Sequence, residues 1–506
     1  MKYIQFIIIV FCGYNVLGQT IKFNKTYSDT LPVARNIFEI SDGYYLLGGS
    51  GYQTYILISK IDTLGNEIWQ KKIKNSSSYL YHGVENSLKR TLDNKYILGG
   101  SSANIYSDSN SVFIAKFDSN LDTIWSKRYF IDTMQSILYG SGITKNNEYL
   151  FVGVTTLTDP YGNVLLFKTD LNGVILWYKE YGNNLPNNGY KVVETWDNGY
   201  LIGGWTNNGV YTGYSGEWYL IKTDSMGNLK WQKNLGNPSY NDGRVCGLLP
   251  TKDSCYIVTG SISMGLSGGE DVQRSRLIKI DTYGNIKWDK RYDYTGIYST
   301  TIDAIEQSDG SIIALSYADS AYIIHTHQTL QKLTPNGDLI WRKRIWFMCD
   351  SFNCYEDNGA NLVSLIQTSD GGFAMAGWVF PSSTVSEQSM WVIKTDSLGN
   401  TCFPDSGELG CMTIVTIEET PTEKGNANIN VFPNPSASSI TIDIQKAENE
   451  QTSIEILSLN GSVIYKNNLP SQQTKQNIDI SSFSKGVYFV TVKSSTFTET
   501  RKLIIQ

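Results

Sequence analysis

Histidine is the rarest side chain in this 506-residue chain that could bind a transition metal. One residue separates His325 from His327, so both imidazoles would face the same side of a β-strand, where they could bind zinc or copper. The third histidine, His82, is remote in the sequence, so any further ligands would have to be carboxylates. We favour an exposed strand and predict no metal site.

Two polar loops, 107–110 and 350–357, offer carboxylate and amide oxygens, which are the ligands that calcium prefers. Their spacing does not match that of a defined calcium-binding loop, so we interpret them as solvated loops. The sequence predicts no cofactor and no catalytic residue in either segment.

An aromatic segment is the best candidate for ligand binding. It contains Trp205, Tyr211, Tyr214 and Trp218, with two asparagines between the first two. Aromatic rings beside amide groups can stack on sugar rings, as polar and aromatic surfaces often do at binding sites. The alternative, which we favour, is that these rings pack on neighbouring structural units.

The scaffold that must position such loops is visible as a repeat. The pattern K-x-D-x-x-G-N-x-x-W-x-K recurs seven times, with some degenerate copies, at spacings between 52 and 62 residues. A fixed period of this size indicates stacked supersecondary units. The residues expected to build it are Asp62, Trp69, Asp118, Trp125, Asp170, Trp177, Asp224, Trp231, Asp281, Trp288, Trp341 and Asp396, with Phe403 in place of the last tryptophan.

A second motif, D-x-x-aromatic followed by two glycines, alternates strictly with the first. Its clearest copies begin at Asp42, Asp93 and Asp197. Together the motifs divide each unit into four short strands, with glycine and asparagine in the tight turns because they accept positive φ. Seven such units predict an all-β protein whose main domain, residues 19–412, is a seven-bladed β-propeller.

The two ends of the propeller predict how its ring closes. Residues 21–27 look like a Trp-x-Lys strand with phenylalanine in place of tryptophan, whereas Pro404 interrupts the strand expected after Phe403. We therefore expect residues 21–27 to complete the last blade by pairing with residues 390–396.

Composition and the N-terminus predict export. The chain has 33 Tyr, 45 Gly, 18% charged residues and a net charge of −6, which is typical of a β-rich extracellular protein and argues against nucleic acid as a partner. Lys2, the apolar run 4–11 and a small residue at Gly18 indicate a signal peptide over residues 1–18. We expect no transmembrane segment, because this run is too short to span a bilayer.

Six cysteines remain after the signal peptide, in three close pairs. In an exported protein they predict three local disulfides, with buried thiols as the alternative. The pairs are Cys246 with Cys255, Cys349 with Cys354, and Cys402 with Cys411.

The composition changes after Cys411. Residues 413–428 read as a linker, and residues 429–506 contain short alternating segments typical of a small immunoglobulin-like β-sandwich. This region also resembles the type A C-terminal sorting domain of the type IX (Por) secretion system of Bacteroidetes-type bacteria. The residues that carry the resemblance are Pro433, Asn434 and Pro435 in the opening box, Gly461 in the central turn, Gly486 and Tyr488 in the closing box, and Lys502 near the end.

That resemblance implies that the secretion machinery is a partner. It also implies export across both membranes, removal of the tail near the linker, and release or attachment to surface lipopolysaccharide. The alternative is an ordinary adhesive sandwich domain.

The repeat itself is similar to two known propeller signatures, the sialidase Asp-box and the tryptophan-docking repeat of quinoprotein dehydrogenases. Both are structural devices. A sialidase would need an arginine cluster, but the arginines are scattered along the chain, and a quinoprotein would need adjacent cysteines, which are absent.

We therefore predict a non-enzymatic binding or adhesion module with a glycan or protein ligand. The rival hypothesis is a polysaccharide hydrolase, which would need two carboxylates about 5–10 Å apart in the central funnel. A purely structural surface protein is the third alternative.

Overall fold

The computed structural model describes most of the strands and turns. The described residues are 22–27, 33–48, 55–74, 78–81, 83, 87–104, 110–131, 135–156, 162–182, 185–207, 216–236, 242–267, 270–292, 298–320, 323–345, 360–379, 389–401, 428–445, 451–458, 463–494 and 498–506. The expected signal peptide, the linker up to residue 427 and Phe403 lie outside them. Contacts divide the chain into two compact units, Met1–Thr416 and Ile417–Gln506.

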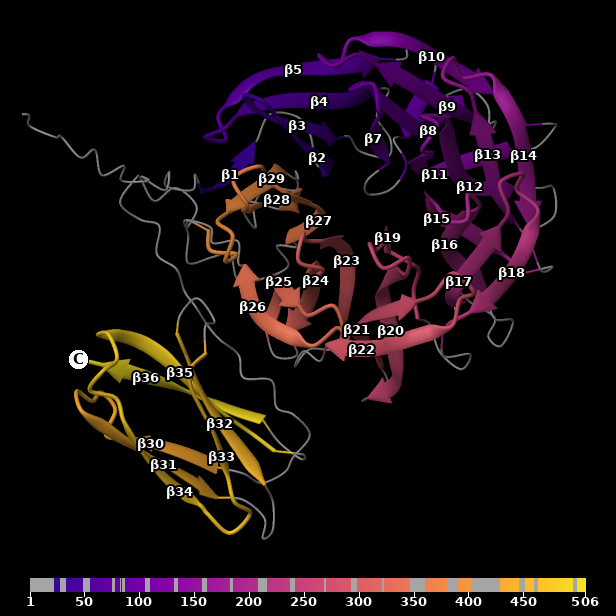
Figure 1. Ribbon diagram of the computed structural model, residues 1–506. Coiled ribbons are helices and arrows are strands. Elements are labelled where there is room, and N and C mark those ends of the chain that lie inside the picture. The colour runs from indigo at the N-terminus through magenta and orange to yellow at the C-terminus, as the bar shows by residue number, and fades with distance from the viewer. Residues whose placement is uncertain are drawn as a thin grey trace, which may run out of the picture. The chain divides into compact units, whose positions relative to one another are not determined.

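The first unit is a ring of seven antiparallel sheets (Figure 1). The first four blades are blade 1, β2(Ala34–Ile40), β3(Gly43–Gly48), β4(Tyr55–Asp62) and β5(Glu67–Lys74); blade 2, β6(Ser78–Tyr81) and β7(Leu88–Arg90), β8(Tyr96–Asn104), β9(Asn110–Phe117) and β10(Thr123–Tyr129); blade 3, β11(Gln135–Ile143), β12(Tyr149–Thr156), β13(Asn163–Thr169) and β14(Ile175–Tyr181); and blade 4, β15(Asn187–Glu194), β16(Tyr200–Asn207), β17(Gly216–Thr223) and β18(Leu229–Asn234).

The other three blades follow the same plan. They are blade 5, β19(Gly247–Pro250), β20(Tyr256–Ser267), β21(Glu270–Ile280) and β22(Ile286–Tyr292); blade 6, β23(Ser299–Glu306), β24(Ile312–Ser320), β25(Ile323–Leu333) and β26(Leu339–Ile345); and blade 7, β27(Ala360–Gln367), β28(Phe373–Val379), β29(Ser389–Thr395) and β1(Phe23–Tyr27). The predicted seven-bladed propeller is confirmed.

Burial within a blade follows strand position. The third strand β17 is buried at every residue, because neighbouring blades cover both faces of the sheet. The rim strand β18 alternates between exposed and half-buried residues, as a strand with one solvated face does. The apolar core therefore lies between blades.

The N-terminal strand closes the ring. β1 pairs antiparallel with β29, with Phe23 opposite Lys394 and Tyr27 opposite Met390. The sequence prediction of this pairing is confirmed, and Phe23 occupies the position expected for the seventh tryptophan.

At six of the seven blade boundaries, the aromatic ring of the rim strand packs on a glycine in the turn between the third and fourth strands of the next blade. In that turn Asp224 accepts backbone hydrogen bonds from Met226 and Asn228, at 2.9 and 2.8 Å. Gly284 occupies the same turn of the next blade with φ +73°, and a Cβ atom added there would lie 2.9 Å from the Trp231 ring. Glycine thus serves both the left-handed backbone and the close approach of the indole.

One disulfide prediction is wrong. Cys246 and Cys255 do not form a disulfide with each other. Cys246 bonds to Thr259 at the far end of the β19–β20 hairpin, whereas Cys255 bonds to Thr251 in its turn. About five residues of strand separate the two along the hairpin, roughly 16 Å, whereas a disulfide needs Cα atoms within about 7 Å. The other four cysteines lie outside the described residues.

The second unit is a two-sheet sandwich. One sheet has the order β30(Asn428–Phe432), β31(Ser439–Gln445), β34(Lys475–Asp479), and the other has the order β33(Val463–Leu469), β32(Thr452–Ser458), β35(Gly486–Lys493), β36(Thr498–Ile505). Its core is formed mainly by isoleucine and valine from both sheets, including Ile442, Ile454 and Val490. This confirms the predicted all-β C-terminal region.

Candidate functional site: the inner strands of the propeller

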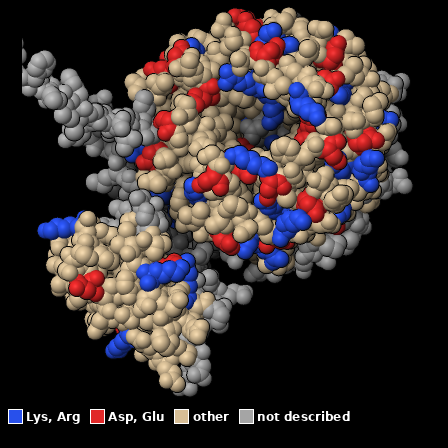
Figure 2. Space-filling view, in the orientation of Figure 1, with Lys and Arg blue, Asp and Glu red and all other residues tan. Residues whose placement is uncertain are grey.

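The two faces of the propeller differ in their connections. Because neighbouring strands are antiparallel, the first and third turns of every blade lie on one face, called here the turn face. The connections between the second and third strands, and between blades, lie on the opposite loop face. Figure 2 shows one face of the propeller, on which acidic and basic side chains alternate around the ring.

An ion pair joins the two repeated motifs within a blade. The lysine of the K-x-D motif, on the third strand, reaches the acidic residue of the turn between the first two strands. The pairs are Lys60–Asp42 at 2.8 Å, Lys168–Glu148 at 2.5 Å, Lys222–Asp197 at 2.9 Å, Lys279–Asp253 at 2.7 Å, Lys332–Asp309 at 3.6 Å and Lys394–Asp370 at 3.0 Å.

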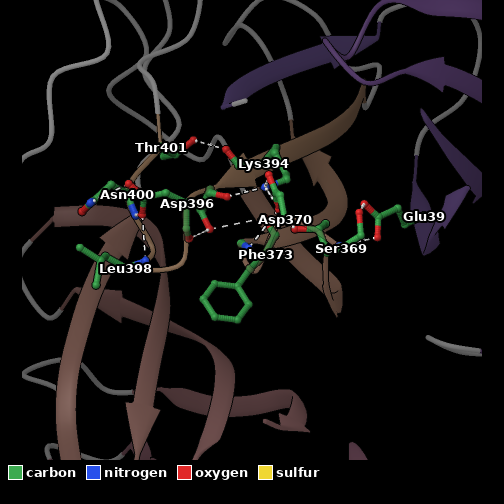
Figure 3. Close-up of polar contacts among 12 residues, drawn as sticks. Glu39, Ser369, Asp370, Phe373, Lys394, Asp396, Leu398, Asn400 and Thr401 are labelled. Atoms are coloured by element: carbon green, nitrogen blue, oxygen red, sulfur yellow. Dashed lines mark hydrogen bonds and ion pairs between the residues drawn. The ribbon is translucent and has the colours of Figure 1, made fainter. Parts of the chain in front are cut away.

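Blade 7 shows how this pair is built (Figure 3). Lys394 is 1% exposed and donates to both oxygens of Asp370 and to the carbonyl oxygen of Thr395. Partial burial opposes ionisation of Asp370, but hydrogen bonds from Thr368 and Lys394 outweigh it and lower the pKa of this carboxyl. Glu39 of blade 1 accepts hydrogen bonds from Ser369 in the same turn.

These charges brace the blades. Each carboxylate of the six pairs faces the lysine of its own blade, so the pair ties the first turn of the blade to its third strand. Sequence reasoning identified both motifs but not that they are the two halves of one ion pair. Their strict alternation, one copy of each per blade, was the available signal.

The inner strands carry the second candidate region. A β-bulge interrupts the first strand of five blades, at Arg35, Tyr139, Tyr190, Ile302 and Val363. A bulge leaves one residue without an opposite partner and redirects its side chain. In these five blades, the innermost strand therefore has one extra side chain near the centre of the ring.

Four tyrosines and one arginine gather there in what we call the inner cluster, made of Tyr139, Tyr190, Arg244, Tyr298 and Tyr317. The rings of Tyr139 and Tyr190 lie 5.0 Å apart, and those of Tyr298 and Tyr317 lie 5.3 Å apart. The guanidinium carbon of Arg244 lies 4.7 Å from the centre of the Tyr190 ring. Blades 3, 4, 5 and 6 each contribute to this cluster, and all five side chains are half-buried.

Burial opposes ionisation of three hydroxyl groups in the inner cluster, those of Tyr139, Tyr190 and Tyr298. Burial raises the pKa of Tyr190 to about 12, although the Arg244 charge opposes the rise. Burial also raises the pKa of Tyr139 and of Tyr298. A tyrosine nucleophile would need activation towards the phenolate, so these hydroxyls are better suited to hydrogen bonding than to attack.

Further cationic groups lie on the same inner strands. Burial and the neighbouring Lys191 lower the pKa of Lys89 to about 8, while Asp303 opposes the shift. The carboxylate of Asp303 accepts backbone hydrogen bonds from Ala304 at 3.0 Å and from Leu365 of the next blade at 3.1 Å. Lys89 thus lies within electrostatic reach of Lys191 and of Asp303, whose carboxylate is engaged in a contact between two blades.

The aromatic segment of the sequence prediction is divided by the structure. Trp218 has no exposed surface and packs beneath Arg276, whose guanidinium carbon lies 5.0 Å from the ring centre. Trp205 is half-buried and pairs across the strands with Trp218. Trp218 therefore belongs to the core and cannot offer its ring to a ligand, while Tyr211 and Tyr214 lie outside the described residues.

Of the histidine pair, the structure describes only the side chain of His327. His327 is buried, and burial together with Arg344 and Arg342 lowers its pKa to about 4. The side chains of His325 and His82 lie outside the described set, as do loop 350–357 and the side chains of 107–110. No described histidine, cysteine or carboxylate belongs to a group of three or more placed to hold a metal ion.

The opening and terminal boxes of the C-terminal unit meet in the sandwich. The Asn434 side chain donates to the carbonyl oxygen of Lys502 at 2.6 Å and accepts from the N–H of Ile504 at 2.9 Å. Ser436 then forms a parallel bridge with Ile505, and Tyr488 donates to the Ser484 carbonyl at 2.7 Å. Gly461, of the central turn, lies outside the described residues.

Residues 430–506 match the family model described as "Secretion system C-terminal sorting domain". The tail is a type IX sorting domain. The protein is therefore exported to the cell surface or beyond it, and its tail is handled by the type IX machinery. Within the described residues, no helix has the length and apolar character needed to cross a membrane.

Comparison with curated proteins gives no match. Among solved structures, the β-propeller domain of the Trilobed protease from Pyrococcus furiosus has 9% identity and a TM-score of 0.40, covering 74% of this chain and 97% of that one. An α-L-arabinanase from Penicillium chrysogenum, complexed with arabinobiose, has 13% identity and a TM-score of 0.41, covering 64% and 94%. Puromycin hydrolase has 10% identity and a TM-score of 0.39, covering 70% of this chain, which spans 50% of that structure.

Proposed function

We propose that the propeller is a non-enzymatic binding module that takes an acidic glycan at the inner cluster. The observation that carries this proposal is the grouping of four half-buried tyrosines with Arg244, with Lys89 and Lys191 on inner strands of the same ring. Tyrosine rings stack on sugar faces, and the fork of an arginine recognises carboxylate or sulfate groups.

The rival hydrolase would need two carboxylates facing a substrate. Of the inner-strand groups described above, Asp303 is engaged with two backbone N–H groups. Glu39 accepts two hydrogen bonds from Ser369, and Glu306 accepts one from Lys252, so both belong to blade-to-blade contacts. These three carboxylates are engaged in contacts between blades, so they are poor candidates for a catalytic acid and base.

The test is equilibrium binding of the full-length chain to uronic-acid, sulfated and neutral polysaccharides, with the soluble products analysed by mass spectrometry. We expect retention of acidic polysaccharide without cleavage, and at least a tenfold weaker Kd for Arg244→Gln. The matched control is Arg90→Gln, because Arg90 is exposed on the inner strand β7 beside Lys89. Release of shortened chains would favour the hydrolase, and equal binding by both variants would exclude the inner cluster.

A further inference from the structure

The seven repeats provide an internal control for a second site. At six of the seven blade boundaries, the rim aromatic ring packs on a glycine whose added Cβ would come within 2.8–3.1 Å of the ring. The six pairs are Phe23 with Gly65, Trp125 with Gly173, Trp177 with Gly227, Trp231 with Gly284, Trp288 with Gly337, and Trp341 with Gly399.

The boundary between blades 1 and 2 departs from this rule. There the turn reads Asp118 to Asp122 with Leu121 in the glycine position, at φ +60°. The Leu121 side chain is fully buried and packs in one cluster with Tyr45 and Trp69. Since even one Cβ would crowd the ring at the other boundaries, Trp69 cannot sit on its turn as the other rings do.

A groove lies at this boundary on the turn face, with a volume of about 390 Å³. Tyr45, Lys60, Trp69, Gln70, Lys71, Asn120 and Asp122 line it. Its volume falls within the range of ordinary small-ligand sites, about 300–1,000 Å³. Leu121, in the position of the glycine, keeps the Trp69 ring away from the turn, and this accounts for the groove at this boundary.

The lining combines an aromatic surface with balanced charge. The rings of Tyr45 and Trp69 lie 5.9 Å apart, and Trp69 is half-buried. Lys71 pairs with Asp122 at 2.6 Å, and Lys60 pairs with Asp42 at 2.8 Å, so the cations are neutralised locally. The exposed amide of Asn120 completes the polar rim.

We propose that this groove binds a neutral pyranose unit of a polysaccharide. The C–H face of a pyranose would stack on Trp69, and its hydroxyls would bond to the Asn120 amide and to Lys71 and Asp122. An acidic ligand is disfavoured because each lysine of the groove already faces a carboxylate. The groove lies at the boundary of blades 1 and 2, whereas the residues of the inner cluster come from blades 3 to 6.

Blade 6 supplies a matched control within the same chain. Its turn contains Asn336, Gly337 and Asp338, and Trp288 and Lys290 of blade 5 face it. Lys290 pairs with Asp338 at 3.1 Å, as Lys71 does with Asp122. The two boundaries thus share their tryptophan, lysine, asparagine and aspartate. They differ in the central residue, leucine or glycine, and in the first two residues of the turn, which are Asp118 and Ser119 in one and Thr334 and Pro335 in the other.

The experiment is isothermal titration calorimetry of the full-length chain with neutral gluco-, xylo- and manno-oligosaccharides of six units. We expect one of these series to bind, and Asn120→Ala to weaken its Kd at least fivefold while Asn336→Ala leaves it unchanged. Leu121→Gly should also weaken binding, because it lets Trp69 close over the turn, and the exposed Asn120 variant covers the case in which Leu121→Gly fails to fold.

Three results would overturn the proposal. They are no heat with any of the three series at millimolar sugar, equal losses for Asn120→Ala and Asn336→Ala, or binding abolished by Arg244→Gln. The last result would assign the sugar to the inner cluster, whereas acidic-glycan binding that survives Asn120→Ala would leave the proposed function intact.

Discussion

The indole N–H of Trp391 donates a 2.7 Å hydrogen bond to Oδ1 of Asn24, and both residues are buried. The two are 367 positions apart, so this bond ties the first strand of the propeller to its last blade. It acts together with the pairing of β1 to β29 and with the contact of Phe23 on Gly65 of blade 1. A ring closed in this way opens only if β1 detaches.

Asn24→Ala should therefore destabilise the whole ring. It leaves a buried indole N–H without its acceptor, which costs about 1–3 kcal/mol of the free energy of unfolding. Urea denaturation followed by tryptophan fluorescence measures the loss. Thr26→Ala, an exposed change on the same strand, is the control and should stay within about 0.5 kcal/mol of the parent. Equal stability of Asn24→Ala and the parent would mean that β1 does not close the ring.

The loss of stability on removing the carboxylate of a lysine–aspartate pair should increase with the burial of its lysine. Asp370→Asn removes the partner of Lys394, whose side chain is 2% exposed, and should cost about 2 kcal/mol. Asp309→Asn is the matched control, because its partner Lys332 is 23% exposed at a longer 3.6 Å, and it should cost below about 1 kcal/mol. The urea midpoints of the two variants give the comparison. A larger loss of stability for Asp309→Asn would show that burial of the lysine does not strengthen the pair.

The lowered pKa of Lys89 should make the binding of an acidic glycan at the inner strands depend on pH. Its folded-state pKa of about 8 lies below the value of about 10.4 for a free lysine, so the folded chain releases this proton first as pH rises. Below pH 8 the charge of the half-buried Lys89 is present and attracts an acidic ligand at some cost to stability. Between pH 8 and about 10.4 the charge is lost in the folded state, so stability rises while acidic-glycan affinity falls.

The measurement is the Kd of the acidic polysaccharide at pH 7 and pH 9, which should increase over this interval. Lys89→Met should bind more weakly at pH 7 and lose most of the pH dependence. A Kd that rises equally in both proteins would place the titrating group elsewhere.

The sequence predicts those structural features that depend on residues close together in the chain. The aspartate and glycine of each turn, the tryptophan on the next rim strand and the phenylalanine that replaces it at Phe23 are local, periodic signals, and the fold follows from them. The pairing of Cys246 with Cys255 failed because closeness in sequence does not fix the register of a hairpin. Trp218 lies in the core because neighbouring blades cover both faces of β17, so every residue of this strand is buried.

The candidate sites were beyond such reasoning for a related reason. Tyr139, Arg244 and Tyr317 come from three blades, and the ring alone brings them together. The groove at Trp69 was visible as one leucine in a glycine position, but its meaning needed the other boundaries for comparison. A copy that departs from the repeat pattern can therefore indicate a binding site.

The last prediction concerns export. Asn434 ties the opening box to the terminal strand β36 through Lys502 and Ile504, so Asn434→Ala removes two hydrogen bonds, each worth about 1 kcal/mol. The terminal strand is then held more weakly against Ser436, and we expect a smaller fraction of the protein at the cell surface and more in the periplasm. Immunoblots of fractionated cells measure this distribution. Thr441→Ala, which removes an exposed contact to Asn477 in the same sandwich, is the control and should leave export unchanged. Normal export of Asn434→Ala would show that the sorting signal is read without this clamp, and loss with both variants would point to general instability of the sandwich.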